Sequence, residues 1–350
     1  MPKSRIEKLK RIARYFIPHK IYLWLSNRKN IIKLKRKRRM ANLTSAPQED
    51  IVNQYWTNVF ETAKACRTQW WESELVRRHL NILTNNVDSP DLAEGLHRLL
   101  AKHLNGRRLK HGVSVGCGKG DKELQLLQLD IVEKFICFDL SEGAIKIAKE
   151  SAKRLDLEDR IEFLVADAFT YNFENLTIDL VHWSGSLHHM IDVPFAVKWS
   201  HDILEQGGVF YMSYEYVGPN LFQFPIHVLN IANEILDELP HKYLKHPHAD
   251  GQYMGRIVNV DPKVLHLQDP SEAADSEKIL GSIKDFFPQA EIIPLGGIIW
   301  AVALTGLYHN FDESNAVDAS ALSHLLQIDK QYAQGENACM SLHASALAIK

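Results

Sequence analysis

The sequence predicts an α/β fold with a doubly wound, mostly parallel sheet. Short β-rich runs alternate with helical segments from residue 111 onward, and a glycine-rich loop joins the first such strand to the first such helix. The 350 residues are 45 % hydrophobic and 24 % charged, enough for one large buried core with embellishments. Strands that alternate with helices form a parallel sheet covered by helices on both faces.

The expected elements follow from hydrophobic periodicity. The strands are expected at residues 111–116, 134–140, 161–167, 178–184, 208–215, 291–295 and 343–349. The helices are expected at residues 47–85, 88–104, 122–128, 142–155, 194–204, 271–287, 298–308 and 316–334. The chain's C-terminus would then close the sheet.

Five segments organise the chain. Residues 1–45 are expected to be a basic arm, partly helical or disordered, and residues 46–110 to be helices that cover the cofactor site. Residues 111–215 form the core, 216–270 a lid insertion, and 271–350 the rest of the sheet with a helical insertion.

The basic arm stands out because residues 1–39 hold 15 Lys or Arg and one acid, while the whole chain has a net charge of −2. Such an asymmetry suggests that the arm has its own partner. Apolar residues around Trp24 favour an anionic membrane surface over nucleic acid.

Cysteine usage and hydropathy indicate a cytoplasmic protein, in peripheral contact with the inner face of the membrane if the arm binds there. The four cysteines contain no Cys-x-x-Cys pair, so neither a disulfide framework nor a zinc site is suggested. The longest apolar stretch, near residues 296–307, is shorter than the roughly 20 residues that span a bilayer.

The glycine-rich loop is the strongest functional signal. Gly116-Cys117-Gly118-Lys119-Gly120 ends a strand and opens a helix, where glycines let backbone N–H groups approach a ligand. In the Gly-x-Gly-x-x-Gly motif of dinucleotide-binding proteins the third glycine would be residue 121, whereas here it is Gly120. Asp121 would repel a pyrophosphate but suits the cationic end of S-adenosylmethionine.

Two further carboxylates follow the next strands. Asp139 can accept the hydrogen bonds of both ribose hydroxyls, or it can cap the following helix. Asp167 can accept the adenine amine, or it can be a turn aspartate; Ala168 could pack on the ring.

From residue 112 to 215 the chain resembles the class I S-adenosylmethionine-dependent methyltransferases. The resemblance rests on the glycine-rich loop, Asp139, Asp167, Trp183-Ser184-Gly185-Ser186-Leu187-His188-His189 and Leu204-Glu205-Gln206-Gly207-Gly208. It implies a Rossmann-like sheet of seven strands whose last strand is antiparallel. It also implies a cofactor site lined by Gly116, Cys117, Gly118, Asp121, Asp139, Leu140, Asp167, Ala168 and Ser184.

The acceptor side carries less information. His188 is the candidate base or substrate contact, because neutral imidazole suits proton removal from a hydroxyl near pH 7. A Tyr-Val-Gly-Pro segment at residues 216–219 resembles a bacterial subgroup that acts on small molecules and glycans. We expect the acceptor to contact Tyr216, Gln223, Glu272 and His309.

No metal site is expected, because His241, His246, His248 and Asp250 match no standard zinc spacing. The leading hypothesis is O-methylation of a small molecule or glycan. One alternative is an RNA methyltransferase recruited by the basic arm, although residues 183–185 lack an Asn/Asp-Pro-Pro-Tyr type of sequence. A second alternative is a cofactor-binding scaffold without activity. The acceptor atom and the oligomeric state stay open.

Overall fold

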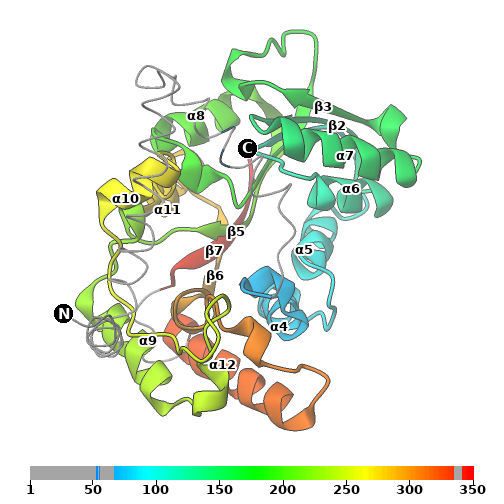
Figure 1. Cartoon of the computed structure of the whole chain (residues 1–350). Coiled ribbons are helices and arrows are strands. Elements are labelled where there is room, and N and C mark those ends of the chain that lie inside the picture. The colour runs from blue at the N-terminus through cyan, green and yellow to red at the C-terminus, as the bar shows by residue number, and fades with distance from the viewer. Residues whose placement is uncertain (1–52, 54, 56–66, 335–340) are drawn as a thin grey trace, which may run out of the picture.

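A seven-stranded sheet with strand order β3-β2-β1-β4-β5-β7-β6 forms the centre of the protein (Figure 1). The computed structural model describes residues 53, 55, 67–334 and 341–350. The strands are β1 (Leu109–Val115), β2 (Val132–Asp139), β3 (Ile161–Val165), β4 (Ile178–Ser184), β5 (Leu204–Tyr216), β6 (Glu291–Gly296) and β7 (His343–Ile349). β1 to β5 pair in parallel, and β7 runs antiparallel between β5 and β6. The predicted fold is confirmed.

The central strands are apolar because helices cover both faces of the sheet. Val113 of β1 pairs with Ile136 of β2 and with Val181 of β4, which fixes the register of three neighbouring strands. β4 and β5 are buried along most of their length, as expected for parallel strands that no face exposes to water. This register aligns the carboxyl ends of the parallel strands along one edge.

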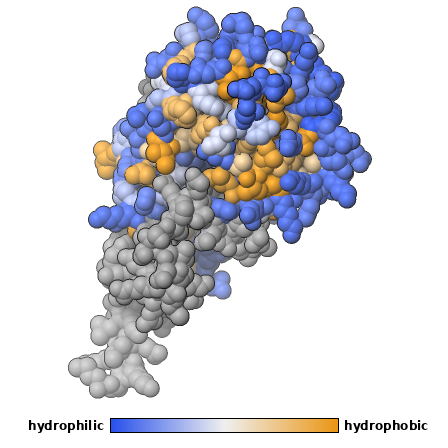
Figure 2. All heavy atoms as spheres, turned by 90° about the horizontal axis from the view of Figure 1, so that it is seen from above, coloured by the Kyte–Doolittle hydropathy of each residue, from blue (hydrophilic) through white to orange (hydrophobic). Residues whose placement is uncertain are grey.

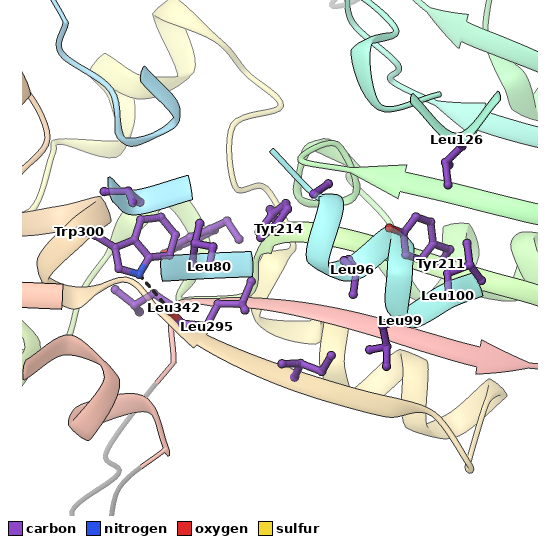
Figure 3. Packing of buried hydrophobic residues seen from close by; sticks show 14 of the residues in the cluster. Leu80, Leu96, Leu99, Leu100, Leu126, Tyr211, Tyr214, Leu295, Trp300 and Leu342 are labelled. Carbon is purple, nitrogen blue, oxygen red and sulfur yellow. Dashed lines mark hydrogen bonds between the residues drawn. The ribbon is translucent and has the colours of Figure 1, made fainter. Parts of the chain in front are cut away.

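Helices lie in two layers (Figure 1). One layer holds α4 (Glu74–Asn85), α5 (Glu94–Leu104), α6 (Asp121–Gln128) and α7 (Glu142–Arg154), whose buried apolar residues share a core with the sheet. Leu96 and Leu100 of α5 lie beside Tyr211 of β5 in this core (Figure 3). The other layer holds α8 (Val193–Ile203) and α11 (Ile279–Phe286), which bury a second cluster against the opposite face.

A helical insertion lies beyond the carboxyl ends of β5 and β6. It contains α9 (Ile226–Glu238), α10 (Pro262–Gln268), a π-helix (Ile298–Ala303) and α12 (Ala316–Gln334). The ring of Tyr243 stacks on that of Phe311 with centroids 4.3 Å apart, which ties residues 216–270 to the segment after β6. The insertion therefore borders the edge where ligands of such sheets bind.

Four expected helices have other bounds. In the described residues, the helix expected at residues 47–85 is replaced by a short 3₁₀ helix (Trp70–Glu72) followed by α4, which begins at Glu74. The helix expected from residue 88 begins at Glu94, because the Asn81 side chain binds the carbonyls of Ser89 and Asp91 and holds these residues in a turn. The helix expected at 271–287 becomes α11, which begins at Ile279. Residues 298–303 form a π-helix rather than the start of a longer helix.

Some expectations concern residues outside the described part of the chain. The basic arm, residues 1–45, lies there, and of residues 46–66 the structure describes Asn53 and Tyr55. Among the described residues no helix has the length and apolarity needed to cross a membrane. Seen from above, the surface mixes hydrophilic residues with gathered apolar ones (Figure 2). Exposed apolar side chains include Ile191 and Phe195, near the start of α8.

Candidate functional site

The loop between β1 and α6 turns sharply at three glycines with positive φ. Gly116 has φ +67°, Gly118 +55° and Gly120 +69°. A Cβ at Gly116 would lie 2.6 Å from Cβ of Ser186, and one at Gly120 would lie 2.6 Å from the ring of Phe163. Both the backbone conformation and the close packing therefore require glycine.

Asp139 joins this loop to the end of β2. Its Oδ2 accepts a hydrogen bond of 2.7 Å from the N–H of Gly118, and its Oδ1 accepts one of 2.7 Å from the N–H of Ser141. Burial raises the pKa of Asp139, although both N–H groups act in the opposite direction. The structure thus brings together Gly118, Asp139 and the half-buried Leu140.

Two other predicted cofactor contacts are carboxylates at the surface. Asp121 is exposed at the first residue of α6. Asp167 is exposed after β3, and its Oδ1 accepts the N–H of Phe169 at 2.9 Å, so it caps a short helical turn. Ala168 is buried beside it, so its contact with an adenine ring remains a prediction.

These residues fit S-adenosylmethionine. Cys117, Gly118 and Lys119 are half-buried after β1, and the N–H of Gly118 binds the carboxylate of Asp139. Asp121, Asp139 and Asp167 follow three strands that are neighbours in the sheet, where the ends of the strands form a ligand crevice. Carboxylates at this edge suit a ligand with hydroxyl, amine and sulfonium groups better than a pyrophosphate.

The second part of the site is built on Glu215 near the carboxyl end of β5. This fully buried carboxylate accepts the backbone N–H groups of Ser186 (3.0 Å), Leu187 (2.9 Å) and His188 (3.2 Å), and it contacts Nδ1 of the His188 ring. Burial works to raise the pKa of Glu215, but the charge of His188 and these hydrogen bonds lower it overall. Glu215 therefore fixes the turn after β4 and the orientation of the imidazole.

Glu272 lies on the other side of the same ring. Its Oε1 is 3.4 Å from Nε2 of His188. Burial would lower the pKa of His188, yet the charges of Glu215 and Glu272 outweigh it and raise the pKa to about 10. In this arrangement the His188 imidazole carries a proton and cannot take one from a hydroxyl. Of the two roles predicted for His188, the arrangement therefore favours contact with the substrate over action as a general base.

His189 belongs to the same group of side chains. Its Nδ1 lies 3.0 Å from Oγ of Ser271 and 3.7 Å from Oδ2 of Asp269, and its ring centroid is 4.2 Å from that of His188. Burial and the charge of His188 lower its pKa. The loop after β4 thus presents two adjacent imidazoles to residues 269–272.

Tyr216, which the sequence predicts to contact the acceptor, lies beside this cluster. Its ring centroid is 6.2 Å from that of His188, and its hydroxyl donates to the carbonyl of Pro219 at 2.9 Å. Burial, followed by the charge of Glu272, raises the pKa of Tyr216. The bend at residues 216–219 therefore forms one wall of the site.

The structure does not bring the other two predicted acceptor contacts to His188. The Gln223 amide donates to the carbonyls of Leu221 (3.0 Å) and Val260 (2.9 Å) and so holds the insertion together. His309 follows the π-helix, and the charges that act on it come from His248, Arg67 and Lys245 rather than from the His188 cluster.

Ser184 at the end of β4 heads a buried chain of polar side chains. Its Oγ accepts a hydrogen bond of 2.8 Å from Ser213, whose hydroxyl lies 3.0 Å from Nε2 of His182. Nδ1 of His182 is 2.7 Å from Glu123, which also accepts the hydroxyl of Ser114 at 2.8 Å. This chain links Ser184 to α6, the helix that the glycine-rich loop opens.

Two described residues of the N-terminal segment reach the site. The side-chain oxygen of Asn53 accepts the N–H of Glu142 at 3.4 Å, at the start of α7 next to Asp139. The pKa of Tyr55 is raised by burial and by the charges of Glu272 and Asp269. Asn53 thus contacts the cofactor side, and the carboxylates of residues 269 and 272 act on Tyr55 through their charge. By contrast, α4 and α5 pack in the core against the sheet.

The acceptor contacts expected from the sequence did not include Glu215, Ser271 or Asp269. An acidic residue inside the apolar run of β5 was an available signal for Glu215, because an ionised side chain is rarely buried without a partner. Ser271 and Asp269 carry no comparable signal, since polar residues are ordinary in a loop.

Comparisons with known proteins point to methyl transfer. A family model described as a methyltransferase domain matches residues 113–212. A demethylmenaquinone methyltransferase of Leptospira interrogans is 30 % identical over 122 residues, which are 33 % of this chain and 49 % of that protein. A 27-O-demethylrifamycin SV methyltransferase of Amycolatopsis mediterranei is 27 % identical over 124 residues, 35 % of this chain and 45 % of that protein. The chain spans about half the length of these curated relatives.

Solved structures include remote likenesses. A geranyl diphosphate C-methyltransferase from Streptomyces coelicolor A3(2) is 11 % identical and has a TM-score of 0.46, covering 87 % of this chain and 99 % of that chain. The [4+2]-cyclase SpnF is 15 % identical and has a TM-score of 0.44, covering 86 % of this chain and 93 % of that chain.

Proposed function

We propose that this chain, which carries a methyltransferase domain at residues 113–212, is a class I S-adenosylmethionine-dependent methyltransferase that methylates a hydroxyl oxygen of a small molecule or glycan. The observation that carries the proposal is the position of His188. Its ring is held between Glu215 and Glu272, four residues after Ser184 at the end of β4. Polar side chains at this place can orient a hydroxyl beside the methyl group.

The cofactor supplies a methyl group on a sulfonium, which an acceptor oxygen displaces in line. Gly118 and Asp139 would hold the cofactor at the ends of β1 and β2, and Asp121 would face its cationic end. Glu272 accepts a hydrogen bond from the acceptor hydroxyl, and His188, fixed by Glu215, holds Glu272 in place. Such positioning can lower the barrier by several kcal/mol, roughly 7–11 in well-oriented intramolecular reactions.

The residues around the His188 cluster would exclude water from the reaction. Tyr216 is buried beside His188, and burial together with the charge of Glu272 raises the pKa of Tyr55. The insertion at residues 216–270 begins at this edge and would close over a bound acceptor.

The relatives support a small-molecule acceptor. The printed name of the Amycolatopsis protein refers to an oxygen of a rifamycin, and the Leptospira protein is named for a demethylmenaquinone. An RNA acceptor has less support, because residues 183–185, at the end of β4, read Trp-Ser-Gly. The arm at residues 1–39 would bind an anionic membrane surface and bring the enzyme to its inner face.

Transfer of tritium from methyl-labelled S-adenosylmethionine to pools of sugars, lipids, polyketides and RNA tests the proposal. Label in a hydroxylated small molecule or glycan, at a position resistant to mild base, is the expected result. Label in RNA alone would replace the proposal by the RNA alternative. Cofactor binding without transfer to any pool would favour the scaffold.

A further inference from the structure

Three potential metal ligands lie close together in the acceptor side of the site: His188, His189 and Glu272. Methyl transfer from a sulfonium does not require such a group. Each offers one donor atom, and these three atoms lie within 4.8 Å of one another. In the described part of the chain this is the one group of at least three His, Cys, Asp or Glu residues with such spacing. The cluster at His241, His246, His248 and Asp250, considered from the sequence, does not form such a group.

The surroundings of both imidazoles match those of metal ligands. A histidine that binds a metal through one ring nitrogen usually has a carboxylate, carbonyl or other polar group on the other, which fixes the ring. Nδ1 of His188 contacts the buried Glu215, which three backbone N–H groups hold. Nδ1 of His189 lies near Ser271 and Asp269.

The spacing also suits a small ion. Two donors about 2.1 Å from a tetrahedral metal are about 3.4 Å apart. Nε2 of His188 and Oε1 of Glu272 are 3.4 Å apart. The side chains of His188, His189 and Glu272 have exposed fractions of 12 %, 16 % and 16 %, so the group is shielded but reachable.

We propose that His188, His189 and Glu272 bind a divalent transition-metal ion of the Zn²⁺ or Co²⁺ class, and that the ion displaces to solvent the proton that His188 carries in its absence. Two imidazoles and one carboxylate are donors that such ions prefer, whereas Mg²⁺ and Ca²⁺ favour sites made of oxygen alone. Three protein ligands leave a coordination position open for a water or an acceptor hydroxyl.

A catalytic role of the metal ion rests on the proposed function, whereas binding of the ion to the protein does not. A hydroxyl in the open position would lose its proton more easily and become a better nucleophile toward the methyl group. The O–H bond breaks, the O–CH₃ bond forms, the S–CH₃ bond breaks, and the proton passes to solvent. Glu215 would then act as a positioning residue for His188.

The test uses the full chain, freed of metal by chelation and dialysis, without cofactor or acceptor. Titration with CoCl₂ is followed by visible absorption, and titration with ZnCl₂ by calorimetry. We expect one ion per chain with a tetrahedral or five-coordinate cobalt spectrum. His189→Ala and Glu272→Gln should each weaken binding at least 10-fold, the scale of a lost ligand or ligand support.

The matched control replaces a second pair of neighbouring histidines. His246 and His248 have ring centroids 6.2 Å apart in the insertion, and His246→Ala with His248→Ala should leave the affinity unchanged. Thermal melting of the metal-free variants shows whether each is folded; Glu272→Gln preserves side-chain volume and keeps the test valid if His189→Ala unfolds. Absence of binding, or equal affinity of wild type and folded Glu272→Gln, overturns the proposal.

Activity separates this inference from the proposed function. Metal binding at His188, His189 and Glu272 without methyl transfer supports the site and contradicts the proposed function alone. Methyl transfer that continues at an unchanged rate in chelated protein overturns the catalytic role of the ion.

Discussion

Glu215 contacts His188 twice, through the backbone N–H at 3.2 Å and through Nδ1 of the ring, although the two residues are 27 positions apart in the chain. One carboxylate thus fixes both the turn after β4 and the direction of the imidazole. Because Glu215 is fully buried, its charge is stable only with these partners. The pair is the structural basis of the acceptor side of the site.

Replacing Glu215 by Gln tests this pair. The amide keeps the volume but loses the charge that orients the ring, so we expect turnover to fall about 10- to 100-fold. Cofactor affinity, measured by calorimetry, should stay within about 2-fold because Asp139 and the glycine-rich loop are unchanged. Glu205→Gln, at an exposed position of β5, is the control. Normal turnover of Glu215→Gln would contradict the assigned role.

Asp139→Ala should weaken cofactor binding. The substitution removes a carboxylate that binds the N–H groups of Gly118 and Ser141 and that we expect to hold the ribose. Hydrogen bonds to a charged group contribute about 1.5–3 kcal/mol, so the dissociation constant should rise roughly 10- to 100-fold. Calorimetric titration with S-adenosylhomocysteine measures it, with the exposed Asp159→Ala as the control. Equal affinities would rule out Asp139 as a cofactor ligand.

Gly116→Ala should damage the loop more than Gly106→Ala, although both glycines have positive φ, +67° and +83°. The backbone strain is about 1–2 kcal/mol in each. A Cβ added at Gly116 would also lie 2.6 Å from Cβ of Ser186. A Cβ added at Gly106 would have no other atom within 4 Å. We therefore expect a larger fall in melting temperature, and a loss of cofactor affinity only for Gly116→Ala. Similar melting temperatures would mean that the loop can move away from Ser186.

Acid should destabilise the protein through buried neutral histidines. Burial lowers the pKa of His79 to about 4 and that of His97 to about 3, below the 6.5 of an unfolded histidine. As the pH falls from 6.5 toward 4, the unfolded state binds protons that the folded state does not, so stability decreases. Each group contributes about 1.4 kcal/mol per pH unit. His188, whose pKa is raised, stays protonated in the folded state over this range, so it opposes this slope near pH 6.5 and adds nothing to it below about pH 5.5, where the unfolded histidine is also protonated.

Urea unfolding between pH 6.5 and 4.5 measures this slope. His79→Gln should reduce it by about 1.4 kcal/mol per pH unit, because a glutamine side chain does not titrate. The exposed His241→Gln should leave it unchanged. An identical slope for His79→Gln and wild type would show that His79 gains a proton in the folded state.

Local pattern was sufficient for the sheet and for the cofactor loop. All seven strands were expected within a few residues of their observed bounds, because each strand is a short apolar run next to a turn or helix signal. The loop at residues 116–120 was recognisable because its glycines lie next to one another in sequence and serve one turn. The starts of helices were less predictable. Asn81, which lies in α4, binds the carbonyls of Ser89 and Asp91, so α5 begins later than expected. The sequence of residues 88–93 contains no signal of that contact.

The sequence by itself therefore determined the α/β fold, the methyl donor and the residues that follow each parallel strand, because these depend on neighbours along the chain. Only the tertiary structure decided that Glu215, Glu272 and His189 meet at His188, while Gln223 and His309 serve the insertion. His189 and Ser271 are 82 positions apart, and hydrophobic periodicity carries no information about how far apart two loops lie. The packing of α8, α11 and the insertion around the carboxyl edge sets that distance.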